Sequence, residues 1–392
     1  MKRIEDLLEG VEEVEFEDVD IEAEEMEFNL LPQYILKEAL SRISRKVPSA
    51  TSIPASKEPF KFRIPTKEYR NQIREVVWGA TKSDGGSRAK SITVGGHMSP
   101  PFYLFEETPP HKPVVSHDVF DIPFRLPSSV KKLFGDSIKS PVSWAKKQVE
   151  DFGAEAITLH LVSTDPLWSN RPSDKAAETV KDVLEAVDVP LIISGSGNYE
   201  KDVEVLTKAA EAAAGERVIL SSVSPDMKDY AKVVKAAKKY DHLLLSLVSM
   251  DVPGMKQMNK KIMKEGLPPE QILMDPNVAS LGYGIEYSIT TMERIRLNAL
   301  SGDNDISMPI LGGVSNAWSA REAWMKDKTL GPKELRGPLW EATTATISIL
   351  SGADVLMMLH PGAIKIVKTL IDTLFDKESN ASRSEYINWV KM

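Results

Sequence analysis

The sequence contains no cysteine among its 392 residues. Without thiols the chain can form no disulfide, carries no thiolate nucleophile and supplies no cysteine ligand to an iron–sulfur cluster. Histidine is also scarce, because only six are present and none has the HxxxH or HExxH spacing of a local zinc site. We therefore expect no metal ligands from this chain and no iron–sulfur cluster on it.

Long apolar runs are missing as well. No window approaches the roughly 20 uncharged apolar residues that span a membrane. The N-terminal sequence MKRIEDLLEG is acidic and lacks the apolar core of a signal peptide. Hydrophobic residues make up 42% of the chain and charged residues 27%, as in ordinary soluble proteins. We expect a cytoplasmic protein.

Negative charge is unevenly distributed along the chain. Residues 1–30 hold 13 acidic and two basic residues, a net charge of −11, whereas the remaining residues carry 47 bases and 44 acids. This body has no basic excess that would indicate nucleic-acid binding. In the acidic arm, acids largely alternate with apolar residues. The pattern is typical either of a flexible solvated tail or of a segment that adds to a partner's sheet edge or groove.

Eight short apolar runs recur between residues 114 and 359, separated by helix-patterned stretches. They are too uniformly apolar for half-exposed antiparallel strands, but they suit parallel strands buried on both faces. Eight strand–helix units in sequence predict an α/β fold, the (β/α)₈ TIM barrel, whose functional sites lie at the C-terminal ends of its strands. The predicted strands are Val114–Phe120, Ala156–Val162, Pro190–Ser194, Val218–Ser222, Leu243–Val248, Gln271–Asp275, Pro309–Gly313 and Asp354–Leu359.

Helical patterns fill the connections between these strands. Ser140-Pro141 is a favourable start for the first helix, and Phe152-Gly153 is a favourable end. The seventh connection contains two helical stretches, at 318–326 and 336–352. The other predicted helices cover residues 173–188, 200–214, 226–240, 255–265, 285–300 and 361–376.

A lead-in precedes the barrel. A short amphipathic helix is predicted at 31–46 and a proline-rich linker at 47–65. The runs Gln72–Trp78 and Lys90–Val94 flank Asp84-Gly85-Gly86, which predicts a β-hairpin that could plug the N-terminal floor of the barrel. The predicted domains are the acidic arm at 1–30, the lead-in at 31–110, the barrel at 111–378 and a C-terminal tail at 379–392.

Polar residues follow nearly every predicted strand. In a TIM barrel these positions converge on one mouth, which here would be rich in hydroxyl, amide and backbone donors and poor in fixed charge. We predict that this mouth binds a ligand. The candidate ligand-binding residues are Ser163, Asp165, Gly195, Ser196, Asn198, Asp275, Gly282, Tyr283, Gly313, Ser315, Asn316 and His360.

Several of these candidates have a second interpretation. The N–H groups of GSGN at 195–198 could cradle a phosphate or an amide oxygen, or the segment could be only a tight turn. Asp165, Asp251 and Asp275 could perform acid–base chemistry or cap the following helices. His160 and His360 could bind a ligand, deliver a proton or serve as structural residues.

Eight segments together carry a family resemblance. They are SITVGGHMSPPFYLFE at 91–106, TLHLVSTDP at 158–166, PLIISGSGN at 190–198, ILMDPNVASLGYG at 272–284, MERIRLNALSGD at 292–303, PILGGVSNAWSAREAW at 309–324, RGPLWEATTA at 336–345 and LSGADVLMMLHP at 350–361. In this order they resemble the small (delta) subunit of the corrinoid iron–sulfur protein of the acetyl-CoA decarbonylase/synthase–carbon monoxide dehydrogenase system. The acidic arm lies outside this resemblance.

The resemblance implies a non-redox barrel subunit that is not catalytic alone. Its expected partner is a large (gamma) subunit that holds a corrinoid (cobamide) and a [4Fe–4S] cluster, within a complex that also contains acetyl-CoA synthase and CO dehydrogenase subunits. The mouth of the barrel would face the corrin ring. The pair would carry a methyl group between a methyl-tetrahydropterin and the nickel cluster of acetyl-CoA synthase, in the one-carbon metabolism of the Wood–Ljungdahl pathway or methanogenesis.

Two other functions stay open at this point. One is a stand-alone pterin-dependent methyltransferase, in which Asp275 and Asn316 would hydrogen-bond the pterin. The other is a phosphate-binding barrel enzyme, which is weakened because the loops after the seventh and eighth strands contain only a partial glycine-rich cradle.

Overall fold

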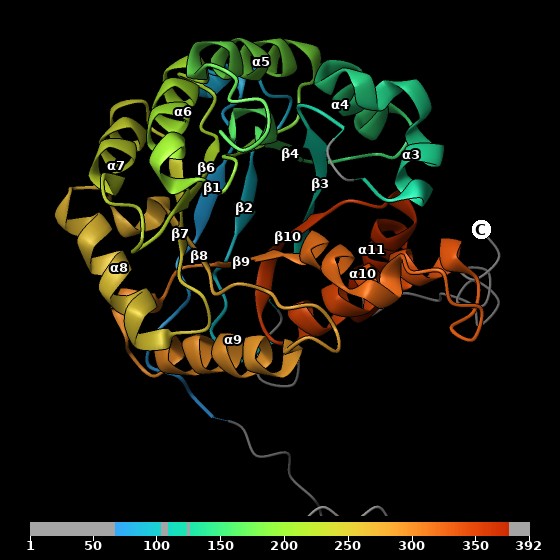
Figure 1. Cartoon of the computed structure of the whole chain (residues 1–392). Coiled ribbons are helices and arrows are strands. Elements are labelled where there is room, and N and C mark those ends of the chain that lie inside the picture. The colour runs from blue at the N-terminus through green and yellow to red at the C-terminus, as the bar shows by residue number, and fades with distance from the viewer. Residues whose placement is uncertain (1–66, 103–108, 124–125, 376–392) are drawn as a thin grey trace, which may run out of the picture. The chain divides into compact units, whose positions relative to one another are not determined.

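The structure, a computed structural model of the chain, describes residues 67–102, 109–123 and 126–375. Eight parallel strands close into a barrel in the order β10-β3-β4-β5-β6-β7-β8-β9 (Figure 1). The predicted TIM barrel is therefore confirmed. The strands are β3 Val114–Phe120, β4 Ile157–His160, β5 Leu191–Ser194, β6 Ile219–Val223, β7 Leu243–Leu247, β8 Ile272–Asp275, β9 Ile310–Gly313 and β10 Ala353–Met358.

The strands lie within two residues of their predicted positions because both of their faces are buried. Alternate side chains of β5 show this, since Ile193 packs outward against the helices while Ile192 packs inside the barrel. Inside, Ile192 meets residues such as Leu243 and Val355 from other strands. A strand buried on both sides reads as a continuous apolar run, which is the signal that the sequence carries.

An outer ring of helices covers the barrel (Figure 1). Most helices agree with the predicted ranges, although α7 begins at Tyr230 rather than at 226 and α8 begins at Val252 rather than at 255. One short helix, α3, was not predicted. The α-helices are α3 Ser128–Phe134, α4 Pro141–Glu150, α5 Ser173–Ala186, α6 Tyr199–Ala212, α7 Tyr230–Lys239, α8 Val252–Lys264, α9 Ile285–Leu300, α10 Lys333–Leu350 and α11 Pro361–Phe375.

The predicted helix at 318–326 is wrong. This stretch forms two 3₁₀ segments, η6 Val314–Ser319 and η7 Arg321–Ala323. The guanidinium of Arg336 on α10 donates to the carbonyls of Glu322 (2.8 Å) and Met325 (2.6 Å). These side-chain bonds satisfy carbonyls that a continuous α-helix would use itself, so the segment stays a tight connection against α10.

The hairpin closes the N-terminal end of the barrel, as predicted. β1 Val76–Trp78 pairs antiparallel with β2 Ile92–Val94, and the inward side chains of both strands join the apolar cluster inside the barrel. The indole N–H of Trp78 donates to the carbonyl of Leu191, the first residue of β5 (2.9 Å). The lower half of the barrel interior is therefore filled by protein.

Two buried arginines link the elements around the N-terminal end of the barrel. Arg88 is buried and donates to the carbonyls of Leu184 and Val187 at the end of α5, while it also pairs with Glu216 (2.7 Å). Elsewhere, Arg296 on α9 pairs with the buried Asp354 of β10 at 2.7 Å. Arg88 thus ties the turn of the hairpin to α5, and Arg296 ties α9 to β10, through charge-assisted bonds.

Some predicted features lie outside the described residues: the acidic arm at 1–30, the helix at 31–46, the linker at 47–65 and the C-terminal tail at 379–392. In the part of the chain that the structure describes, no helix is both long enough and apolar enough to cross a bilayer.

The hairpin plug yields a stability prediction. Trp78 is fully buried whereas its neighbour Val77 is 40% exposed. Trp78→Ala should lower the free energy of unfolding by about 3–5 kcal/mol, because it opens a cavity beneath the barrel. Val77→Ala, the matched control in the same strand, should change it by less than about 0.5 kcal/mol. Denaturant unfolding of both variants checks this, and equal effects would show that the hairpin does not support the barrel.

Candidate functional site

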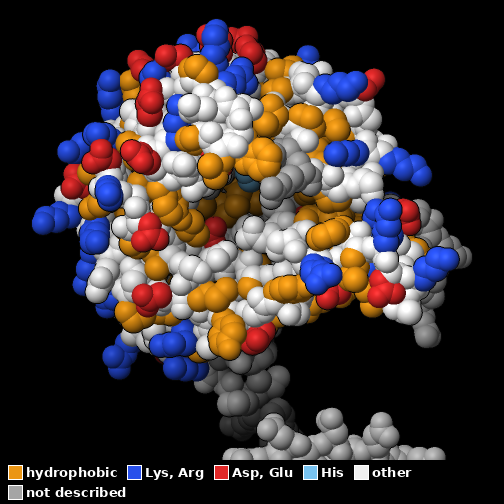
Figure 2. Space-filling view, in the orientation of Figure 1, with side chains coloured by type: hydrophobic (Ala, Val, Ile, Leu, Met, Phe, Trp, Pro, Cys, Tyr) orange, Lys and Arg blue, Asp and Glu red, His pale blue; other side chains and the backbone are white. Residues whose placement is uncertain are grey.

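The open end of the barrel is the mouth formed by the C-terminal ends of its strands. Figure 2 shows a hollow at the centre of the molecule with hydrophobic side chains around it, whereas Lys, Arg, Asp and Glu gather mainly on the outer helices. Several large apolar side chains are exposed on the loops that follow the strands and in the first turn of α9. These rim residues are Leu167, Trp168, Tyr283, Tyr287 and Trp324.

Hydrogen bonds connect the ends of β7, β8 and β9 at this mouth. The side-chain amide of Asn277 donates to Ser249 Oγ (3.1 Å), and the amide of Asn316 donates to Asn277 Oδ1 (3.4 Å) and to the carbonyl of Val278 (3.2 Å). Asn277 has a φ of +66°, which asparagine tolerates better than most residues. The predicted residue Asn316 thus belongs to a chain of uncharged donors and acceptors.

Asp275 lies beneath this amide chain at the end of β8. Burial raises the pKa of its carboxyl to about 7, although the N–H of Asn277, 2.7 Å from Oδ1, acts in the opposite direction. A carboxyl with this pKa is about half protonated at pH 7, so it can donate as well as accept a hydrogen bond at the mouth. Asp275 caps no helix, since α9 begins after Gly284.

The loop after β4 contains two of the predicted ligand-binding residues, Ser163 and Asp165. Ser163 is buried and donates through its hydroxyl and its backbone N–H to Asp121, at the end of β3. Burial raises the pKa of Asp121. Asp165 accepts from the N–H of Leu167 (2.8 Å), so it shapes the exposed turn and does not cap α5. Asp251 occupies the N-cap position of α8, but its side chain makes no capping hydrogen bond.

The segment at 195–198, for which a cradle of backbone N–H groups and a tight turn were both open, forms a turn closed by an internal acceptor. The N–H groups of Ser196 and Gly197 both donate at 2.8 Å to Asp202 on α6, whose buried carboxylate takes the place of an external anion. A Cβ on Gly195 would lie 2.4 Å from the same carboxyl carbon, so the glycine is required by this internal contact. Asn198 caps α6 by accepting from the N–H of Lys201 (3.1 Å).

The loop at 279–284 forms part of the rim. Gly282 and Gly284 have φ values of +79° and +99°, which favour glycine. Between them Tyr283 is half-exposed, and its hydroxyl donates to Glu322 (2.9 Å) across the mouth loops. On the β9 side, Gly313 is buried at the strand end and Ser315 is half-buried in η6.

His360, after β10, is held by internal bonds. Its Nδ1 accepts from the N–H of Gly362 (3.0 Å), and burial lowers its pKa to about 4, so the ring is neutral at pH 7. The backbone N–H groups of Leu359 and His360 donate to Glu341 of α10, a buried carboxyl whose pKa burial raises to about 8. Both groups therefore contribute little charge.

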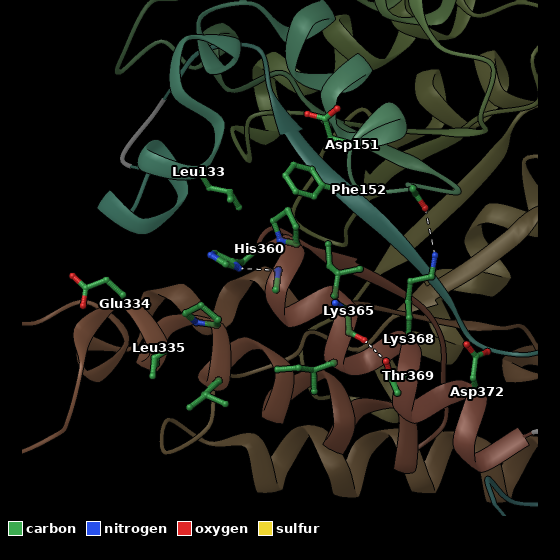
Figure 3. A pocket seen from close by; sticks show the side chains of 17 residues that line it. Leu133, Asp151, Phe152, Glu334, Leu335, His360, Lys365, Lys368, Thr369 and Asp372 are labelled. Atoms are coloured by element: carbon green, nitrogen blue, oxygen red, sulfur yellow. Dashed lines mark hydrogen bonds between the residues drawn. The ribbon is translucent and has the colours of Figure 1, made fainter. Parts of the chain in front are cut away.

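His360 also lines a cavity of about 750 Å³ on the flank of the barrel rather than at its mouth. Figure 3 shows this space between α11, the first turns of α10 and the end of α4, with Leu133 and Phe152 on one side and Leu335 on the other. The lining is mainly apolar and contains none of the other predicted residues.

Sequence analysis missed the buried acids that organise the mouth. Asp118 in β3, Asp121, Asp202 and Glu341 are all buried. Asp118 was detectable, because it interrupts an apolar strand in the sequence VVSHDVF. Asp202 and Glu341 were not, because a single acid in a helical pattern normally faces water. Among the described residues, no group of three or more His, Asp or Glu side chains is placed to hold a metal ion.

The fold and the site define a class of protein: a (β/α)₈ barrel with a plugged floor and an open, largely uncharged mouth. The family model for the CO dehydrogenase/acetyl-CoA synthase delta subunit matches residues 75–373. The chain therefore belongs to the CO dehydrogenase/acetyl-CoA synthase delta subunit family. Membership makes it a subunit of a multi-subunit complex.

Individual relatives agree with this assignment. The chain is 47% identical over 364 residues to the acetyl-CoA decarbonylase/synthase complex subunit delta of Methanopyrus kandleri, covering 92% of this chain and 90% of that protein. It is 46% identical over 334 residues to that of Archaeoglobus fulgidus, covering 83% and 74%. Among solved structures it is similar to a Yersinia pestis dihydropteroate synthase, with a TM-score of 0.46 and 13% identity over 68% of this chain and 95% of that one.

The raised pKa of Asp275 predicts a pH-dependent stability difference. The unfolded carboxyl titrates near its ordinary value of 3.8 and the folded one near 7, so the folded state holds the extra proton between these values. The stability that this carboxyl contributes is therefore complete below about pH 4 and is lost as the pH rises to 7. Asp275→Asn stays neutral and keeps an acceptor for Asn277.

We expect the free energy of unfolding of the wild-type chain to fall relative to that of Asp275→Asn by about 1.4 kcal/mol per pH unit in this window. Denaturant unfolding at several pH values measures the difference between the two curves. The titration of Glu341 contributes equally to both curves, because the residue is present in both proteins, so it does not affect their difference. Parallel curves from pH 4 to pH 7 would contradict the assignment of Asp275 as a buried, protonated carboxyl.

Proposed function

We propose that this chain pairs with a corrinoid- and [4Fe–4S]-bearing gamma subunit and caps the cobamide with its barrel mouth. In this role it supports methyl transfer between a methyl-tetrahydropterin and the nickel cluster of acetyl-CoA synthase, in reversible acetyl-CoA synthesis or cleavage. The single observation that carries the proposal is the mouth itself, which is open and rich in hydrogen-bonding groups, while Glu341 and His360 are held neutral and Asp275 is partly protonated at pH 7.

The donor set of the mouth fits a corrinoid. The corrin ring is fringed with uncharged amides, which both donate and accept hydrogen bonds. Ser249, Asn277 and Asn316 offer the same uncharged chemistry, and Asp275 can donate when it is protonated. A strongly anionic substrate would instead require fixed positive charge, which these residues do not supply.

The corrinoid, when bound, supplies the chemistry, because its cobalt accepts and releases the methyl group. The chain's own residues would orient the ring and exclude water. Asn277 and Asn316 would contact ring amides, Tyr283 would contact the ring edge, and the rim residues would meet the gamma subunit around it. Excluding water protects a reactive intermediate and strengthens the electrostatic interactions around it.

The test is co-expression of the full chain with the gamma subunit, followed by gel filtration and an ultraviolet–visible spectrum of the eluted peak. We expect a heterodimer with corrinoid absorption and no corrinoid on this chain alone. Failure to associate, together with binding of a methyl-tetrahydropterin by the lone chain, would favour a stand-alone methyltransferase instead.

The rim yields a prediction about affinity. Leu167, in the loop between β4 and α5, is 85% exposed, and we expect the gamma subunit to bury it. Leu167→Asp should weaken the heterodimer about tenfold or more, since burying a charge at an interface core is unfavourable. The matched control is Leu350→Asp at the C-terminal end of α10, where the leucine is 48% exposed but far along the helix from the mouth. Isothermal titration calorimetry compares them, and equal losses would place the interface elsewhere.

A further inference from the structure

Asp118 is a buried carboxylate with almost no protein partner. It lies in β3, its side chain is 0% exposed, and neither oxygen has a hydrogen bond to a described residue. Burying an ionised carboxylate without a partner is costly, so such a group is normally paired. Its position therefore demands an explanation.

The nearby titratable groups, with one exception, do not supply that partner. His117, the preceding residue, bonds Gln148 on α4, and burial lowers its pKa to about 4, so it is neutral at pH 7. Glu341 is the other titratable neighbour, and it is an acid. Among the described residues, the group that lies within ion-pair distance of Asp118 is the imidazole of His160 in β4, whose Nε2 is 3.1 Å from Asp118 Oδ1.

The His160 ring is fixed on two sides. Its register partner in β3 is Phe120, and the two rings stack with centroids 4.6 Å apart and planes 17° apart. The Asp118 carboxyl group lies 3.1 Å from Nε2 without an aligned hydrogen bond, and its negative charge favours the tautomer that carries the proton on Nε2. Phe120 and Asp118 both belong to β3, so a barrel strand and not a loop sets the orientation of the ring and the position of Nδ1.

Nδ1 of His160 is then the nitrogen left for a ligand. It has no hydrogen-bond partner among the described residues, and the side chain is 15% exposed at the mouth end of β4. With the proton on Nε2, Nδ1 accepts when the ring is neutral and donates when the ring is charged. A primary carboxamide satisfies both states because it carries an N–H donor and a carbonyl acceptor.

We infer that His160, positioned by Asp118 and Phe120, forms a subsite for a primary carboxamide of the ligand in the mouth. The identity of that ligand rests on the proposed function, since the side chains of the corrin ring end in such amides. Asp118 acts as a positioning residue. It makes no ligand contact itself but orients the ring and selects its tautomer.

The first test compares the affinity of the full chain for the corrinoid-loaded gamma subunit. His160→Leu removes the nitrogen and should raise the Kd about tenfold, as expected for loss of a buried hydrogen bond. His160→Asn places an amide near the position of Nδ1 and should stay within about threefold of wild type. His111→Leu is the matched control, because His111 forms a similar pair with Glu75 (2.9 Å) before β3, on the floor side.

Unchanged affinity of His160→Leu, or equal losses for the leucine and asparagine variants, would overturn the subsite. The second test is independent of the partner and of variant folding. ¹⁵N-histidine spectra of the wild-type chain are recorded while cyanocobalamin, which carries primary carboxamides, is added in large excess, so that binding too weak to survive gel filtration of the lone chain is still detected. We expect the Nδ1 signal of His160 to shift and that of His111 to stay in place.

The two tests separate the subsite from the proposed function. If the gamma subunit does not bind but cyanocobalamin shifts the His160 signal, the pairing is wrong and the subsite stands. If the gamma subunit binds, yet His160→Leu has no effect and the His160 signal does not move, the subsite is wrong and the pairing stands. No response in either test overturns both.

Discussion

The barrel interior of this protein can be reached from one end only, and the site depends on this constraint. Strand β10 closes against β3, and the hairpin β1–β2 fills the floor with Trp78 and its apolar neighbours. A ligand can therefore approach only from the C-terminal ends of the strands, which are followed by the polar loops. Burial of the floor and exposure of the mouth are two consequences of the same packing.

Burial shifts several ionisable groups of the upper barrel toward their neutral forms. Burial raises the pKa values of Asp275 and Glu341 to about 7 and 8, and it lowers that of His360 to about 4. Asp202 accepts hydrogen bonds from the backbone of the turn at 195–198, and Asp118 lies within ion-pair distance of His160. What the mouth offers a ligand is mostly uncharged hydrogen bonding, surrounded by exposed apolar side chains. Such a surface suits a large neutral ring held by a second protein.

The sequence predicted the fold closely because strands buried on both faces leave a strong apolar signal, and all eight were located. The short helix α3 was not predicted, and the 3₁₀ segments after β9 were missed because the tertiary bonds of Arg336 hold the carbonyls of that stretch. The site was predicted less well. Chain position identified Asp275 and Asn316 as mouth residues, but only the structure shows that Asp202 fills the turn at 195–198. Hydrogen bonds between distant residues leave no local pattern.

The central claim is that the mouth, and not the floor, faces the corrinoid-bearing subunit. Site-specific photo-crosslinking in the assembled complex tests it most directly, with one probe at Leu167 on the rim and one at Val77 on the floor, since both side chains are exposed. We expect the probe at Leu167 to capture the gamma subunit and the probe at Val77 not to capture it. Capture from Val77 alone would contradict the central claim.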